Sequence, residues 1–305
     1  MKKKPLPGDD AKTMYKQRHL DRVHRFLMAS DTVRGFLVRG DRLVRELRAN
    51  HGFGPLETMV AGQGAMGALL MAANLKDAGK VRLQWESAGP VGGMSFEADS
   101  HGAVRGFLKN NPIVIEEKGP QFTDLFGPGF LTVSRLFEKG GDPMNGTVAL
   151  RYGKIAEDLA IYHLESEQIP TAMALSVAFD ENGESLGAGG LFLQALPGAD
   201  ENVLDTLEEA LNNLPSLGEA FASGQTVEEY IEQVFSSHSP RILSSKRVEF
   251  FCPCDSQLFA RYMKGLSQKD QKEIREKGPF PLEITCQNCA SVYSYSQEDI
   301  QKLLG

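Results

Sequence analysis

The chain has 305 residues, of which 41% are hydrophobic and 24% are charged, and this composition excludes a wholly disordered protein. Its length is typical of two domains, or of one large domain with an appendage. The formal net charge of −7 disfavours sequence-independent binding to nucleic acid, which depends on neutralising phosphates, and four cysteines are too few for a disulfide-dense secreted scaffold.

The start of the chain, MKKKPLPGDDAKTMYKQRH, has a basic head without the apolar run that a secretory signal needs. Nowhere does an apolar stretch reach the ~18 residues expected of a membrane span. We therefore expect a cytoplasmic protein without a membrane partner. In that reducing compartment, clustered cysteines indicate a metal or redox site rather than permanent disulfides.

Residues 11–196 mix predicted helices and strands without a regular alternation, which favours an α+β core. Helices are expected within 11–29, from Asp41, from Pro55 to Leu75, and at 155–167. The helix from Pro55 carries small residues that let backbones pack closely, so we expect it to be buried. Strands are expected at 31–38, 81–86, 92–99, 103–108, 130–137, 146–152, 171–180 and 189–196.

Gly62, Gly64 and Gly67 form a G-x-G-x-x-G pattern, and Glu86 follows 19 residues later, as in dinucleotide-binding folds. That fingerprint requires a buried strand before the first glycine, but the apolar groups of PLETMVA step by three and four residues, as in a helix. We therefore interpret the pattern as part of the buried helix. The sequence also contains no H-E-x-x-H, G-x-S-x-G or Walker motif, so we predict no enzyme activity.

The negative charge is concentrated in residues 197–245, which contain one basic and nine acidic residues, a net charge of −8. Thr226 and Glu229 in this segment fit a capping box at a helix start. Two interpretations remain open: surface helices docked permanently on the core, or a detachable segment. Two apolar stripes at helical spacing run through the segment: Val203, Leu204, Leu207, Leu211 and Leu214, then Val227, Tyr230, Ile231 and Val234.

All four cysteines lie near the C-terminus, as Cys252-Pro-Cys254 and, 31 residues later, Cys286-Gln-Asn-Cys289. Four soft thiolates in two close pairs suit one tetrahedral Zn²⁺ site, and zinc-bound thiolates react with peroxide or hypochlorite. Structural zinc contributes about 10 to 16 kcal/mol to a small module, whereas a whole domain has only about 5 to 15 kcal/mol of net stability. Losing the metal is therefore expected to unfold the module. A static zinc ribbon that only staples the C-terminus is the alternative.

Several longer motifs occur in order along residues 31–305: VRG (33–35), GPVGGMSFEADSHGAVRGF (89–107), IAEDLAIYHLESEQIPTA (155–172), GAGGLFLQALPGADE (187–201), and the C-x-C plus C-x-x-C followed by YSYSQEDIQKLL. With these motifs the chain resembles the heat-shock protein 33 family of redox-regulated molecular chaperones. Because five motifs keep their order over nearly the whole chain, the resemblance is more specific than the cysteine pattern alone.

The resemblance implies an α+β core with sheets around a buried helix, and one Zn²⁺ held by Cys252, Cys254, Cys286 and Cys289 in an inactive, reduced state. It also implies that oxidation expels zinc and forms the disulfides Cys252–Cys254 and Cys286–Cys289. The module and the linker before it then unfold, and a homodimer binds unfolding client proteins without ATP. A monomer is expected in the reduced state.

We accordingly expect an N-terminal extension (1–30), a chaperone core (31–196), an acidic helical linker (197–245) and a zinc-binding redox switch (246–305). The predicted function is a redox-regulated holdase. The first alternative is a constitutive zinc-ribbon interaction protein, including one that contacts RNA; the near-neutral C-terminal module and the acidic linker weigh against it. A thiol–disulfide oxidoreductase is the second, and it is disfavoured because both cysteine pairs are needed for one zinc.

Overall fold

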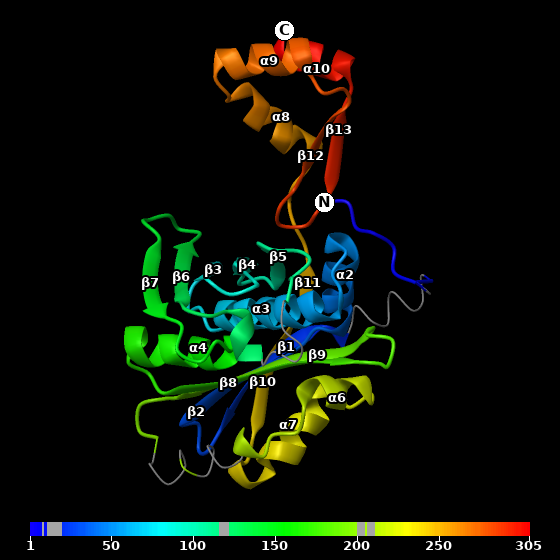
Figure 1. Ribbon diagram of the computed structural model, residues 1–305. Coiled ribbons are helices and arrows are strands. Elements are labelled where there is room, and N and C mark those ends of the chain that lie inside the picture. Colours follow the sequence, from blue (N-terminus) through cyan, green and yellow to red (C-terminus); the bar gives the residue numbers. More distant parts are fainter. Residues whose placement is uncertain (8, 11–19, 116–121, 200–204, 206–210) are drawn as a thin grey trace.

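The computed structural model describes residues 1–7, 9–10, 20–115, 122–199, 205 and 211–305, which form two β-sheets on either side of one long helix (Figure 1). The first sheet has the strand order β10-β1-β2-β9-β8, with bounds Arg22–Met28 (β1), Val33–Arg39 (β2), Thr171–Phe179 (β8), Ser185–Ala195 (β9) and Arg241–Arg247 (β10). The second has the order β11-β5-β4-β3-β6-β7, with bounds Gly79–Ser87 (β3), Gly93–Asp99 (β4), Ala103–Leu108 (β5), Gly129–Phe137 (β6), Met144–Ala149 (β7) and Glu249–Phe250 (β11).

Helix α3 (Pro55–Ala73) lies between the two sheets and contacts strands of both. Fourteen of its 19 residues are buried, as expected for a helix that is apolar all round. A Cβ atom at Gly64 would lie 2.6 Å from the Phe96 ring, and one at Gly67 would lie 2.8 Å from a Leu159 methyl group. The glycine pattern therefore belongs to close helix packing, as predicted, and not to a nucleotide-binding loop.

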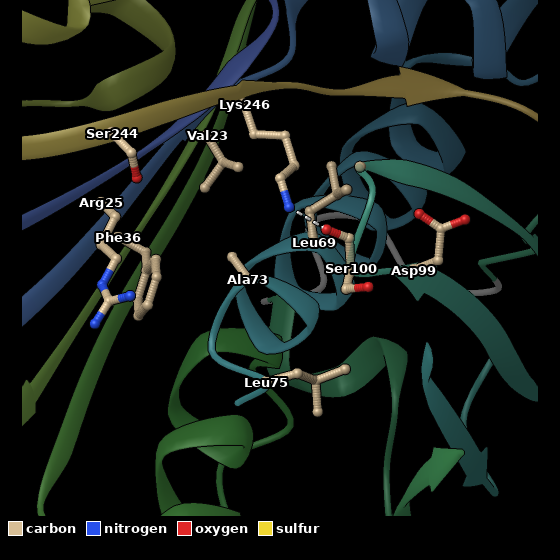
Figure 2. A pocket seen from close by; sticks show the side chains of 11 residues that line it. Val23, Arg25, Phe36, Leu69, Ala73, Leu75, Asp99, Ser100, Ser244 and Lys246 are labelled. Carbon is tan, nitrogen blue, oxygen red and sulfur yellow. Dashed lines mark hydrogen bonds between the residues drawn. The ribbon is translucent and has the colours of Figure 1, made fainter. Parts of the chain in front are cut away.

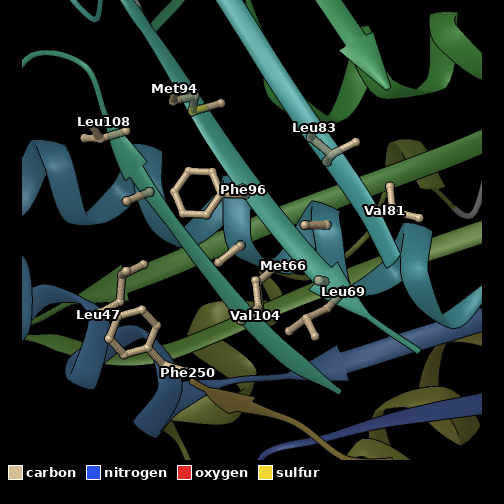
Figure 3. Close-up of a cluster of buried hydrophobic side chains, with 14 of the residues drawn as sticks. Leu47, Met66, Leu69, Val81, Leu83, Met94, Phe96, Val104, Leu108 and Phe250 are labelled. Carbon is tan, nitrogen blue, oxygen red and sulfur yellow. The ribbon is translucent and has the colours of Figure 1, made fainter. Parts of the chain in front are cut away.

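The main apolar core surrounds α3 and takes side chains from both sheets and from the C-terminal module; Figure 3 shows its part between α3 and the second sheet. Met66 and Leu69 of α3 lie among side chains from β3, β4 and β5, including Leu83, Phe96 and Val104. Strand β11 joins this sheet through a parallel pairing with β5, in a sheet whose other pairings are antiparallel. Phe250 of β11 is fully buried, so the backbone just before Cys252 is anchored in the main core.

Shorter helical elements cover this core: α2 (Asp41–His51), α4 (Ile155–Tyr162), the 3-10 turn η1 (Phe122–Leu125) and the π-helical turn η2 (His163–Glu167). Helix α2 has no side-chain cap of its own at Gly40. Its first turn is capped from a distance, because the buried Asp21 carboxylate accepts the backbone N–H groups of Arg42 and Leu43 at 3.3 and 2.7 Å.

The linker helices α6 (Leu217–Ala222) and α7 (Val227–Phe235), followed by η3 (Ser236–His238), cover the face of the first sheet that points away from α3. The predicted capping box at α7 is confirmed, since the Thr226 hydroxyl and the Glu229 carboxylate each accept the other's backbone N–H. Of the first predicted stripe, Val203, Leu204 and Leu207 lie outside the described residues. A second apolar cluster, hereafter the docking cluster, joins both layers: Phe26, Met28, Val33, Leu37, Leu191, Leu193, Leu217, Phe221, Val227, Tyr230, Ile231 and Phe235.

The C-terminal module projects from the other end of the molecule, away from the linker helices (Figure 1). It contains the hairpin β12 (Leu282–Thr285) and β13 (Val292–Tyr295) and the helices α8 (Ser256–Lys264), α9 (Gln268–Lys277) and α10 (Gln297–Leu304). In the part of the chain that the structure describes, no helix combines the length and the hydrophobicity that crossing a membrane requires.

Two sequence predictions need correction at the first sheet. The partly helical spacing of 11–29 is wrong for Arg22–Met28, which forms strand β1 between β2 and β10, so this part of 1–30 is no extension. Both faces of β1 are covered: Val23 enters the main core, and Phe26 enters the docking cluster. That double burial removes the alternation that reveals a strand. The end of the expected helical linker, residues 241–245, likewise lies in β10, whose seven residues are all exposed.

Candidate metal centre

Two short chain segments place the four cysteines. Cys252 and Cys254 follow directly after β11, and Cys286 and Cys289 lie in the tight turn between β12 and β13. In that turn, the Cys286 carbonyl accepts the N–H groups of Cys289 and Ala290 at 3.3 and 2.7 Å. Ala290 takes a left-handed conformation with φ of 51°, which lets the chain reverse within four residues. The turn that carries Cys286 and Cys289 is thus fixed by its own backbone hydrogen bonds.

The four sulfur atoms form one compact group, all within 4.8 Å of one another. The Cys252 and Cys286 sulfurs are 3.9 Å apart, and those of Cys254 and Cys289 are 3.3 Å apart. Sulfurs at about 2.3 Å from a tetrahedral zinc would be about 3.8 Å from one another, so the arrangement fits such an ion. All four side chains are buried, with at most 6% of any residue exposed. A buried cluster of four thiols with this spacing could hold one metal ion.

Electrostatics within the cluster also favour a cation. Hydrogen bonds from the Cys286 and Cys289 thiols, with a further contribution from Arg105, hold the pKa of Cys252 well below its usual range. The same hydrogen bonds to Cys252 raise the pKa of Cys286 and of Cys289. One thiolate therefore suppresses the ionisation of its neighbours, and four thiolates could coexist here only around a positive ion.

A charged network on the second sheet reaches the cluster. The Arg105 guanidinium, on β5, lies 3.6 Å from the Cys252 sulfur and 2.8 Å from a Glu97 carboxylate oxygen. Arg82 binds the other oxygen of Glu97 at 2.7 Å. From the module itself, the Tyr293 hydroxyl lies 3.3 Å from the Cys254 sulfur and donates to the Cys254 carbonyl at 2.8 Å. Groups from both the core and the module therefore meet at the sulfurs.

The backbone runs from the first cysteine to the linker within a few residues. Phe251 and Glu249 donate their N–H groups to Val104 and Gly102 of the β4–β5 region, both at 2.9 Å. Val248 donates to the Asp21 carbonyl at 3.0 Å, and β10 then pairs with β1 along its length. This stretch crosses from the second sheet to the first, so it links the cysteines to the linker helices at the far end of the molecule (Figure 1).

Strand β10 also forms the outer wall of a small cavity of about 200 Å³ (Figure 2). Lys246 reaches across it and donates a hydrogen bond to the Ser100 carbonyl in the β4–β5 turn. Val23, Phe36 and Leu69, all nearly fully buried, line the cavity behind it. Departure of β10 would therefore open the edge of the first sheet and uncover core side chains.

Sequence reasoning missed the residues that hold the linker helices on the sheet. Arg39, at the end of β2, donates to the carbonyls of Phe221 and Gln225 at 3.1 and 3.0 Å, and its charge is balanced by Asp41 at 2.7 Å. It therefore caps the C-terminal end of α6 from the core. The only sequence signal is a charged residue directly after an apolar strand, which by itself predicts a surface position.

Comparison with known proteins identifies the chain. A family model described as Hsp33 protein matches residues 21–296. The chain belongs to the Hsp33 family. Among the Hsp33 relatives, the 33 kDa chaperonin of Desulforamulus reducens is 32% identical over 288 residues, which is 93% of this chain and 97% of that protein. The 33 kDa chaperonin of Geobacter sulfurreducens is also 32% identical, over 93% of this chain and 94% of that protein.

A crystal structure of the Hsp33 homologue from Thermotoga maritima, a 33 kDa chaperonin, has the same fold, with a TM-score of 0.84 at 28% identity. The match covers 94% of this chain and 98% of that one. The resemblance drawn from the sequence motifs and the predicted α+β fold with its buried helix are thus confirmed. Membership of the Hsp33 family makes the chain a chaperone that binds client proteins, and its four clustered cysteines fit the metal and redox chemistry of the prediction.

Proposed function

We propose that this Hsp33 chain is an ATP-independent holdase that is inactive when Cys252, Cys254, Cys286 and Cys289 hold one Zn²⁺ and active when they are oxidised. The observation that carries the proposal is the position of the sulfurs. They lie where the C-terminal module meets the core, at the end of a stretch that also holds the linker in place. Zinc, when bound, would keep the four thiols deprotonated and tie the two cysteine segments together.

Oxidation removes the sulfur ligands in two balanced steps. One thiolate attacks hydrogen peroxide, takes up an oxygen as sulfenic acid and releases hydroxide; a second thiolate then displaces hydroxide to form a disulfide. Each disulfide thus consumes one peroxide, and two protons convert both hydroxides to water. In the reduced structure, the Cys252 sulfur contacts the Cys286 sulfur, and the Cys254 sulfur contacts the Cys289 sulfur.

We propose that the oxidised pairs are instead Cys252–Cys254 and Cys286–Cys289. Disulfides between near neighbours leave the two cysteine segments unconnected, so the module can open. Disulfides across the cluster would staple the module closed and block activation. Mass spectrometry of peptides from the oxidised protein separates the two outcomes, because cleavage between residues 254 and 286 releases two peptides only for near-neighbour pairs.

Opening of the module would release β11 and then β10, and with β10 the neighbouring linker helices. Six strand residues of the docking cluster would lose their cover: Phe26, Met28, Val33, Leu37, Leu191 and Leu193. Each fully buried apolar side chain of this kind is worth about 1.5 to 3 kcal/mol against water, so the uncovered face would bind apolar segments of unfolding clients. The net charge of −8 in residues 197–245 would keep the freed linker soluble.

We further propose a cytoplasmic location, a monomeric reduced form and a dimeric oxidised form. The test of the function compares zinc-loaded reduced protein with peroxide-oxidised protein. Zinc release is followed with a chromogenic chelator, and protection is measured as suppressed light scattering of a chemically unfolded client. Oxidised protein should release one zinc per chain and protect the client, whereas reduced protein should do neither. An oxidised form that loses zinc but protects no better than the reduced form contradicts the proposal.

Proteolysis tests the linker separately. In the reduced state, a protease should spare residues 211–240, because α6 and α7 are docked on the first sheet; after oxidation it should cut there first. A Cys252→Ser, Cys254→Ser double variant controls for direct effects of peroxide on the linker. In this double variant, the protease should cut the linker equally fast before and after peroxide treatment. Equal cutting of the wild-type linker in both states would show that the cysteines do not control it.

A further inference from the structure

The first residues of the chain lie outside the family match, which begins at residue 21, yet they contact the cysteine module (Figure 1). The Met1 nitrogen donates to the Cys254 carbonyl at 2.7 Å, and the Met1 sulfur accepts the Cys252 N–H at 3.0 Å. The Lys2 N–H donates to the Ser291 hydroxyl at 2.9 Å, and that hydroxyl donates back to the Lys2 carbonyl at 3.1 Å. The segment therefore touches both cysteine-bearing parts of the module.

The Lys2 side chain extends the same contact along β13. Its ammonium group donates to the Val292 carbonyl at 2.7 Å and lies 4.9 Å from the centre of the Tyr293 ring. Tyr293 is the residue whose hydroxyl contacts Cys254. Charge-assisted hydrogen bonds and cation–π contacts are among the stronger interactions available to an exposed lysine.

The next residues bind the core instead of the module. The Lys3 ammonium group pairs with the buried Glu46 of α2 at 2.5 Å, and the Asp9 carboxylate pairs with Arg42 of the same helix at 2.7 Å. Between these two ion pairs, Leu6 is buried. One face of α2 therefore anchors the segment at Lys3 and again at Asp9.

Asn50, near the end of α2, joins all three parts. Its amide oxygen accepts the Lys4 N–H at 3.0 Å, and its amide nitrogen donates to the Lys2 carbonyl at 3.0 Å and to the Cys289 carbonyl at 2.9 Å. Asn50 is itself buried, and its bond to the Cys289 carbonyl is buried with it. Core, N-terminal segment and cysteine turn are thus held by one side chain.

We propose that the described N-terminal residues, 1–7 and 9, act as a strap that holds the cysteine module on α2 and raises the amount of oxidant needed to open it. This inference rests on the proposed redox switch and adds its regulation. The strap bonds to the module at one end and to the core at the other, so any opening that moves the module away from α2 must break one of these two sets of contacts. It therefore stabilises the closed form specifically, without contributing a ligand to the metal.

The test compares the zinc-loaded wild-type chain with a variant that lacks residues 2–10. Zinc release is timed with a chromogenic chelator at a fixed peroxide concentration. One net hydrogen bond corresponds to a factor of about 2 to 12 in an equilibrium, so loss of several strap bonds should speed zinc release by about tenfold or more. Amide exchange in residues 284–293 should rise before any oxidant is added. Release at the wild-type rate, with unchanged exchange, overturns the strap.

Point variants keep the test decisive if the shortened chain folds poorly. Lys2→Ala removes the side-chain contacts of Lys2 to Val292 and Tyr293. Lys3→Ala removes the ion pair to Glu46 of α2. Each should speed zinc release. Lys4→Ala is the matched control, because Lys4 binds Asn50 through its backbone, which the substitution retains. Equal rates in all three variants would contradict the proposal. None of these measurements uses a client, so a failure of holdase activity would be seen separately, as a wild-type chain that releases zinc without protecting clients.

Discussion

Gly187→Ala should loosen the linker while leaving the cysteines untouched. Gly187 lies on β9 beneath helix α6, and a Cβ atom there would be 2.2 Å from the Gly218 carbonyl oxygen and 2.7 Å from the Ala222 nitrogen. Both neighbours are backbone atoms of the helix, so no side-chain rotation can relieve the overlap. The helix must move away from the sheet, or its docking must become weaker.

The expected cost is that of overpacking, about 1 to 3 kcal/mol. Since 1.4 kcal/mol is a factor of ten, the population with an undocked linker should rise by a factor of about 5 to 150. Movement of α6 also separates Arg39 from the Phe221 and Gln225 carbonyls, which it holds at 3.1 and 3.0 Å. The effect should therefore spread along the linker and not remain at one methyl group.

Amide exchange and limited proteolysis of residues 211–238 in reduced, zinc-loaded protein measure this population. Gly187→Ala should bind zinc in the wild-type ratio, expose the linker, and protect clients partly without oxidation. Leu186→Ala is the control, because this neighbouring side chain is 50% exposed and its loss removes few contacts. If the folded Gly187→Ala chain keeps wild-type exchange in α6 and α7, the argument that the glycine provides room for the linker is wrong.

Three further outcomes are expected. Thr226→Ala removes the capping box of α7, at a cost of about 1 kcal/mol, and should speed amide exchange in residues 227–235 about fivefold, while exchange in α3 stays constant. Cys286→Ser should abolish stoichiometric zinc binding and make the reduced linker as protease-sensitive as the oxidised wild type; a zinc-loaded, protected variant would refute the four-sulfur site. Burial lowers the pKa of His163 to about 3, so its ring stays neutral in the folded chain while the unfolded chain takes up a proton below about pH 6.5. The free energy of unfolding should accordingly fall by about 1.4 kcal/mol per pH unit between pH 6 and 3 from this group, and urea titrations of a His163→Gln variant should show a shallower slope.

Structure could be predicted from the sequence where it depends on uniform burial or on hydrogen bonds between near neighbours in the chain. The helix from Pro55 was predictable, because its small and apolar residues have no polar face to present. The capping box of Thr226 and Glu229 was predictable too, since it depends on local hydrogen bonds alone. The four cysteines were predicted as one group from their spacing, and the structure places them together.

Elements whose structure depends on distant partners were not predictable. Strand β10 has seven exposed residues and no alternation, and only its pairing with β1 makes it a strand. The contacts of Lys2 and Lys3 follow from the position of α2 and the cysteine module, which no local pattern encodes. No local pattern indicates which helix Gly187 accommodates, because that contact depends on the linker folding back across the first sheet.

The docking cluster would also control how a bound client dissociates from the chaperone. Its strand side is the proposed client surface, and its helix side belongs to the same chain. A tethered segment competes for such a surface at an effective concentration in the millimolar range, whatever the amount of protein in the cell. Once the cysteines are reduced and the linker can refold, it displaces any client that binds more weakly than this internal competitor. The linker would then set an upper limit on client affinity at the point of release, and no nucleotide hydrolysis would be needed to empty the site.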